Sequence, residues 1–168
     1  VICALIITSA SFGQLTLVKT IPGDYATLAL AIADLNFQGV GAGGVTFNIA
    51  AGYTETFTSP TAGTITATGT LANQIIFQKD PATSGANPVI TAGIGTTTNV
   101  DGIIKIAGGD YFTFDGIDLT ESAGNITATT QMEWGYALVK ASNTFPVNGC
   151  QYVTIKNCTI TLNRNNNA

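Results

Sequence analysis

Acidic side chains are concentrated between residues 110 and 121, where Asp115, Asp118 and Glu121 lie at intervals of three residues. A hard cation such as Ca²⁺ binds several oxygens, so these three residues are the candidate calcium ligands, and no other cofactor is expected. The alternative is that they are solvated acids of turns, because Asp115 and Asp118 flank a predicted corner and their side chains diverge there. No apolar surroundings are expected to separate their pKa values, which makes them a poor acid–base pair.

A second group with chemical potential is Glu133, Trp134 and Tyr136, which follow the loop 122–132. An exposed aromatic ring offers a stacking platform for a sugar ring, and polar groups beside it fix the orientation of the sugar. These three residues are the candidate glycan-binding residues. The alternative is that Trp134 packs the preceding loop against the body of the protein.

The composition excludes several classes of function. The chain has 168 residues, 6 Lys and Arg against 10 Asp and Glu, and a net charge of -4, so it lacks the basic surface that nucleic acids require. It contains no His, which removes the commonest general base and metal ligand. We therefore assign no catalytic residue, and the expected partner is a polysaccharide or cell-surface glycan.

The first residues have the character of an export signal. Residues 1–10 form an uncharged apolar run that is too short to span a bilayer, and Ser11 and Gly13 are the small residues typical of a cleavage site before Gln14. Residues 1–13 are therefore interpreted as the remnant of a signal peptide. The mature chain is expected to be secreted or displayed at the cell surface, without a membrane span. The alternative is that the apolar run forms a buried first strand.

An internal repeat is the strongest structural signal. Residues 111–120 align without gaps on residues 152–161, and each copy consists of two alternating strands separated by two residues. The alternation is preserved if the two residues form a sharp corner, and Gly116 and Asn157 tolerate the left-handed conformation of such a corner. Because Gly93 precedes Ile94 as Gly116 precedes Ile117, Gly93 is expected to occupy a third corner.

Earlier segments extend the repeat. The first strand of each unit is predicted to begin near residues 45, 74, 103 and 136, a period of roughly 30 residues that is typical of a three-faced parallel solenoid. Residues 45–168 are thus predicted to form about four coils of an all-β parallel β-helix, truncated at the C-terminus. An antiparallel sandwich is the alternative. Residues 14–44 are predicted to form an N-terminal strand and a capping helix, with Asp24 as N-cap and Gly39 as stop.

Three side-chain arrangements follow from this register. Tyr111 and Tyr152 occupy the same position of the repeat, so their rings are expected to stack outward as a ladder. Threonines recur at alternate positions, but the unequal coils predict that they do not align in one flat row. Cys150 and Cys158 are separated by a strand and a corner, so we expect no disulfide between them.

The N-terminal half resembles the opening of right-handed parallel β-helix proteins of the pectin-lyase-like superfamily. The resemblance lies in the segment from Gly23 to Leu28, in residues 45–49 and in Gly52-Tyr-Thr-Glu55, which is similar to the opening of pectin methylesterases. The resemblance implies a structural role for Glu55. The overall composition and pattern of the sequence are similar to those of secreted surface proteins of Bacteroidota.

The catalytic motifs of that superfamily have no counterparts in this chain. The expectation is therefore a non-catalytic extracellular module of a longer exported protein, acting as a scaffold, adhesin or glycan-binding surface. The alternative is the N-terminal part of a polysaccharide lyase, esterase or hydrolase, whose active site lies beyond residue 168.

Overall fold

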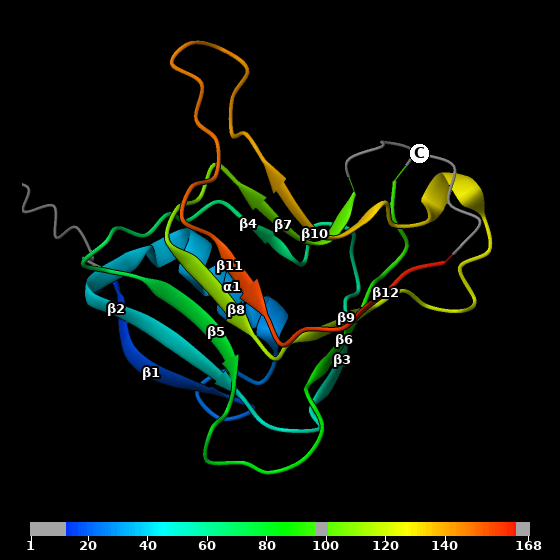
Figure 1. Ribbon diagram of the computed structural model, residues 1–168, viewed down its shortest axis with the longest axis horizontal. Helices are drawn as coiled ribbons and strands as arrows, with labels where there is room; N and C mark the ends of the chain where they lie inside the picture. The colour runs from blue at the N-terminus through cyan, green and yellow to red at the C-terminus, as the bar shows by residue number, and fades with distance from the viewer. Residues whose placement is uncertain (1–12, 97–100, 164–168) are drawn as a thin grey trace, which may run out of the picture.

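The computed structural model of the chain describes residues 13–96 and 101–163 (Figure 1). The fold is rich in β-structure and contains one α-helix, α1 (Leu28–Gln38), and a short 3-10 helix, η1 (Ala128–Thr130). Sheet A consists of β1 (Leu15–Ile21), β2 (Val40–Ile49), β5 (Ile75–Lys79), β8 (Phe112–Asp115) and β11 (Thr154–Lys156), in that order. Sheet B consists of β3 (Thr54–Thr56), β6 (Val89–Thr91), β9 (Asp118–Thr120) and β12 (Ile160–Thr161). Sheet C consists of β4 (Thr64–Ile65), β7 (Gly102–Ala107) and β10 (Trp134–Val139).

Neighbouring strands in all three sheets are parallel. From β2 onward the chain visits sheets A, B and C in a fixed order and then returns to sheet A. The gap-free repeat is confirmed by the register, because Thr113 pairs with Thr154 and Leu119 pairs with Ile160. Each strand therefore lies against the corresponding strand of the previous passage.

The core lies between the three sheets and is organised in columns of side chains. Phe47, Phe77 and Phe114 occupy one register position of sheet A, and their ring centroids are 4.6 and 5.1 Å apart. All three rings are almost fully buried. Because parallel in-register pairing places equivalent residues above one another, a short alternating strand in each passage is enough to build this column.

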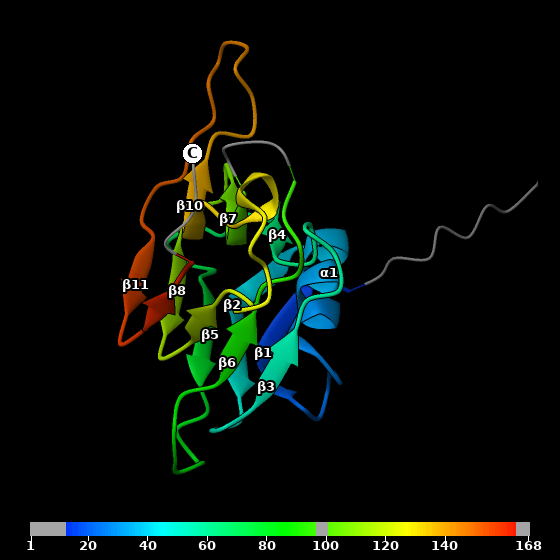
Figure 2. The same cartoon turned by 90° about the vertical axis from the view of Figure 1, so that its right-hand side faces the viewer.

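The helix α1 covers one end of the sheets. Its buried residues Leu28, Ile32 and Leu35 pack on the core, and the Asn36 side chain bonds to the backbone of the β4 region at Thr64 and Thr66. Figure 2 shows α1 and β11 at opposite ends of the molecule. At the far end, β10, β11 and β12 are the outermost described strands of their sheets.

The helix ends where the sequence predicts and begins later. Gly39 has φ 71° and its N–H bonds to the Leu35 carbonyl, which confirms the predicted stop. The N-cap is Thr27, whose hydroxyl accepts from the Leu30 N–H, and the expectation for Asp24 was wrong. The Asp24 carboxylate instead accepts hydrogen bonds from the N–H and hydroxyl of Thr20.

The predicted set of first strands needs correction. The strands beginning near 45 and 74 are β2 and β5 of sheet A, whereas those near 103 and 136 are β7 and β10 of sheet C. The partner of β5 in sheet A is β8. The period of roughly 30 residues misled the assignment because the connections between strands differ in length, so equal spacing did not mean equal position.

The corner assigned to Gly93 is also wrong. Val89 pairs with Asp118, so Asn87 is the residue equivalent to Gly116, and Gly93 lies after β6 rather than before it. A Cβ at Gly93 would lie 2.6 Å from the Phe57 carbonyl oxygen, so close packing is the reason for this glycine. Gly116 and Asn157 adopt φ values of 69° and 56° at corresponding corners of two successive passages.

The signal-peptide interpretation falls largely on residues 1–12, which lie outside the described residues, and it stays a prediction.

Candidate functional site

The structure separates the three candidate glycan-binding residues. Trp134 begins β10 and is 52% exposed, so its ring is available to a ligand. Tyr136 is only 8% exposed, packs against Phe114 and donates a hydrogen bond from its hydroxyl to the Ile117 carbonyl. Burial raises the pKa of Tyr136. Tyr136 is therefore a core residue and the expectation of a sugar contact was wrong, because Tyr136 pairs with the buried Ile104 in sheet C and its ring lies against Phe114.

Glu133 has a structural partner. One of its carboxylate oxygens accepts a hydrogen bond from the Asp101 N–H at 3.0 Å, and the Trp134 N–H donates to the Asp101 carbonyl. These contacts join the start of β10 to the start of β7. Of the three candidates, Trp134 alone presents a largely exposed side chain.

The candidate calcium ligands do not converge. Within residues 13–96 and 101–163, no group of three or more His, Cys, Asp or Glu side chains is arranged to hold a metal ion. Asp115 forms an ion pair with Lys156 at 3.2 Å and accepts from the Asn157 side chain at 2.7 Å. The bond from Asn157, together with the Lys156 ammonium, holds the pKa of Asp115 below its ordinary value. Asp118 accepts from the Asn87 side chain and from a backbone N–H.

Glu121 anchors the loop between β9 and β10. It is 5% exposed, and its carboxylate accepts from the Met132 N–H at 2.8 Å, the Asn125 amide at 3.0 Å and the Asn163 N–H at 2.9 Å. Asn125 in turn bonds the hydroxyl and carbonyl of Thr130. A buried carboxylate is stable when such donors surround it. Glu121 therefore shapes the loop between β9 and β10.

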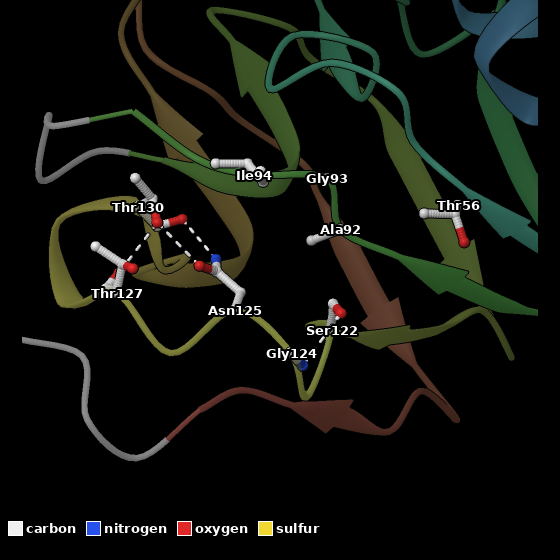
Figure 3. Close-up of a pocket in the computed structure, with 9 residues that line it drawn as sticks. All are labelled: Thr56, Ala92, Gly93, Ile94, Ser122, Gly124, Asn125, Thr127 and Thr130. Atoms are coloured by element: carbon white, nitrogen blue, oxygen red, sulfur yellow. Dashed lines mark hydrogen bonds between the residues drawn. The ribbon is translucent and has the colours of Figure 1, made fainter.

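This loop forms one wall of a groove of about 610 Å³ (Figure 3). Thr56 comes from β3, Ala92, Gly93 and Ile94 come from the segment after β6, and the other labelled residues come from the loop after β9. The nine lining residues are Thr, Ser, Asn, Gly, Ala and Ile, and none has an ionisable side chain. The groove therefore offers hydroxyl groups and small apolar surfaces to a neutral ligand.

Two of these hydroxyls have no partner among the described residues. The side-chain hydroxyls of Thr56 and Thr127 make no hydrogen bond to another described residue, whereas the hydroxyl of Thr130 is held by Asn125. Thr56 also starts a row of threonines, because Thr91, Thr120 and Thr161 occupy the same register position in the successive strands of sheet B. The expectation that the threonines do not align was wrong for this sheet, because its strands pair without a register shift.

A second groove, of about 320 Å³, was not predicted from the sequence. It lies beside Tyr111 and Tyr152, whose rings stack with centroids 4.4 Å apart, which confirms the predicted ladder. Desolvation and the neighbouring Tyr152 raise the pKa of Tyr111. The spacing of the repeat identified the ladder, but the groove also depends on Leu71 and Gln74, which come from an earlier passage of the chain.

Cys150 and Cys158 are both free, as the sequence predicts. Each thiol lies within hydrogen-bonding distance of backbone carbonyls, those of Ile106 and Val139 for Cys150 and that of Lys156 for Cys158.

Comparison of the chain with protein-family models, with curated proteins and with solved structures gave no match. Among the described residues, no helix combines the length and the apolar character needed to cross a membrane.

Proposed function

We propose that the chain is a non-catalytic, extracellular glycan-binding module of a longer exported protein, and that it folds as a right-handed parallel β-helix. The three-sheet arrangement supports the fold, because the chain passes sheets A, B and C cyclically and pairs each strand with its predecessor. Parallel crossover connections are right-handed in about 98% of cases. The superfamily resemblance at Gly52-Tyr-Thr-Glu55 points in the same direction.

The lining of the groove in Figure 3 is the observation that carries the functional proposal. General acid–base or nucleophilic chemistry requires a titratable or activated side chain within reach of the substrate. The described lining residues offer hydroxyls, an amide and small apolar groups instead. Such a surface can recognise the hydroxyl groups and C–H faces of a neutral sugar. It offers no group that could cleave the glycosidic bond of that sugar.

Binding in this groove is expected to use the unpartnered hydroxyls of Thr56 and Thr127 as hydrogen-bonding groups. Ile94, which is 67% exposed, offers an apolar surface at the same groove. The loop wall is preorganised by Glu121 and Asn125, so little ordering is required when a ligand binds.

The proposal is tested by affinity electrophoresis of the full chain in gels that contain neutral soluble polysaccharides, with hydroxyethyl cellulose, xylan and glucomannan as the probes. The wild-type chain is expected to be retarded by at least one of them. The double substitution Thr56→Val and Thr127→Val removes two hydroxyls without changing side-chain shape and is expected to reduce the retardation clearly. Thr66→Val removes an exposed hydroxyl outside the groove and is the matched control.

Two results would contradict the proposal. Equal retardation of the wild type and the double variant would show that the groove does not bind the glycan. Release of reducing sugar or unsaturated product from any of the probes by the full chain would show that it is an enzyme.

One observation favours a second candidate function. The outermost strands β10, β11 and β12 carry exposed side chains, including Ile155 and Ile160, on the end opposite α1. Further turns of a β-helix would cover them. Such turns would also be able to carry the active site of a polysaccharide lyase, esterase or hydrolase, for which this segment would be the capped beginning.

A further inference from the structure

Two tyrosines occupy a backbone conformation that disfavours them. Tyr111 and Tyr152 have φ values of 57° and 56° and occupy equivalent register positions in sheet A, Tyr111 directly before β8 and Tyr152 two residues before β11. A bulky residue with positive φ is uncommon, and glycine adopts this conformation without a steric penalty. The chain does use glycine at the equivalent register position within β2, where Gly44 has φ 81°. The two later corners instead keep a large aromatic ring despite the backbone strain.

The conformation places the two rings against each other on the surface. Their centroids are 4.4 Å apart and their planes differ by 17°. Tyr152 is 67% exposed, so one of its sides stays open to solvent. Leu71, which is 74% exposed, lies at the same groove. Aromatic and aliphatic surfaces around a groove of this size match the C–H faces of a pyranose ring.

The groove also has polar side chains in its lining. Thr113 and Thr154 pair in register in sheet A, and Gln74 immediately precedes β5. The side chains of these three residues, which all line the groove, make no hydrogen bond to another described residue. Hydroxyl and amide groups that are free beside an aromatic surface are suited to the hydroxyls of a sugar. None of the described lining residues is acidic or basic, so the groove has no feature that selects a charged ligand.

We propose that the groove beside Tyr111 and Tyr152 is a second binding site for a neutral pyranose unit, separate from the groove of Figure 3. One face of the sugar packs against the tyrosine pair and Leu71, and its hydroxyls bond to Thr113, Thr154 and Gln74. This inference shares the class of ligand with the proposed function but uses a different surface. The two sites can therefore be confirmed or refuted separately.

The test is an NMR titration of the ¹⁵N-labelled full chain with cellohexaose and maltohexaose, and with hexagalacturonate as the charged probe. A neutral hexasaccharide is expected to shift the amide signals of Thr113, Thr154 and Gln74 in a saturable way. Tyr152→Asn keeps a residue that tolerates positive φ but removes the ring, and is expected to weaken binding at least about tenfold. Tyr152→Phe keeps the ring and is expected to bind within about threefold of the wild type.

A second variant removes the hydroxyls without affecting the backbone corner. Thr113→Val combined with Thr154→Val keeps β-branched residues in sheet A and is expected to weaken binding by a similar factor. The double variant Thr56→Val and Thr127→Val, in the groove of Figure 3, is expected to leave these shifts unchanged.

Three results would overturn the inference. The first is that neither neutral probe shifts the amide signals of residues around the tyrosine groove, and the second is that only hexagalacturonate shifts them. The third is that Tyr152→Asn binds the neutral probe as tightly as the wild type. Shifts confined to Asn125, Thr127 and Thr130 would support the proposed function and overturn this second site.

Discussion

The carboxylate of Glu55 in β3 accepts a hydrogen bond from the backbone N–H of Leu28, the first residue of α1, over 2.6 Å. Its second oxygen accepts from the Ala29 N–H at 3.1 Å, and the Tyr53 hydroxyl donates to the same carboxylate. The first N–H groups of a helix lack partners within the helix and carry a partial positive charge. A residue from the first strand of sheet B therefore fixes the capping helix on the end of the sheets.

This relationship explains the segment Gly52-Tyr-Thr-Glu55 and predicts its importance for stability. Glu55→Ala removes two charge-assisted bonds to the helix and is expected to lower the free energy of unfolding by roughly 2–3 kcal/mol. Glu55→Gln keeps an acceptor oxygen and is expected to cost roughly half as much. Urea unfolding followed by circular dichroism measures both. If Glu55→Ala unfolds at the same urea concentration as the wild type, the cap contributes nothing to stability.

Tyr53 predicts how stability changes in alkali. Burial and the bond to Glu55 raise the pKa of Tyr53 from 10.0 to about 12. As the pH rises, the unfolded chain loses the tyrosine proton before the folded chain does, so stability is complete below about pH 10 and falls between about pH 10 and 12. Tyr53→Phe removes this titration, and its unfolding free energy is expected to fall less steeply over that range. An identical slope in both proteins would contradict the assignment.

The fold was predictable from the sequence wherever the chain repeats without gaps. The segments 111–120 and 152–161 differ by no insertion, so the alternation of Phe112 and Phe114 with polar neighbours determined both the pairing and the inward face. The assignment failed at β7 and β10, because the connections before them have different lengths. Periodicity identifies a strand, but its sheet depends on how many residues the preceding loop uses.

The candidate site was less predictable because its walls come from distant segments. Trp134 and Tyr136 are both aromatic residues of β10, and only the structure shows that one is exposed and the other is buried. The groove of Figure 3 combines Thr56 with residues of a loop almost seventy positions later, held in place by the buried Glu121. No local pattern in the sequence connects those segments.

The corner at Asn157 predicts a graded response to substitution. Its backbone has φ 56°, and its side chain donates to the Asp115 carboxylate at 2.7 Å. Asn157→Val loses the bond and resists this conformation, so it is expected to destabilise the fold by about 2 kcal/mol. Asn157→Gly loses the bond alone and is expected to cost about 0.5–1 kcal/mol.

The same pair of variants has a spectroscopic readout. The bond from Asn157 is the main cause of the lowered pKa of Asp115, so the pKa of Asp115 is expected to rise toward 3.8 in Asn157→Gly. Thermal melts and an NMR titration of the Asp115 carboxyl group measure the two effects. Equal melting temperatures for Val and Gly at this position would be inconsistent with a left-handed corner.

Glu121 predicts a link between loop order and ligand binding. Glu121→Gln replaces one acceptor oxygen by an NH₂ group, which then faces a backbone N–H donor in a buried site. The expected cost is roughly 2 kcal/mol, with faster proteolytic cleavage within residues 122–131. Retardation by neutral polysaccharide is expected to weaken as well. Asp118→Asn, which alters a partly exposed acid outside the loop, is the comparison, and equal cleavage rates in both variants would exclude an anchoring role for Glu121.

The open end of the sheets predicts self-association of the isolated chain. The strands β10, β11 and β12 are the outermost strands described in their sheets, and Ile155 is 38% exposed although its register partner Phe114 is buried. Unpaired strand edges template further pairing. Because α1 covers the other end, two copies that meet through their open ends form a closed dimer rather than a filament.

Sedimentation velocity over a hundredfold concentration range is expected to show a dimeric fraction that increases with protein concentration. Ile155→Lys places a charge on the inward face of the edge strand and is expected to shift the chain to monomer, whereas Thr66→Lys, away from that end, is not. A wild-type chain that stays monomeric at the highest concentration would show that the edges are protected.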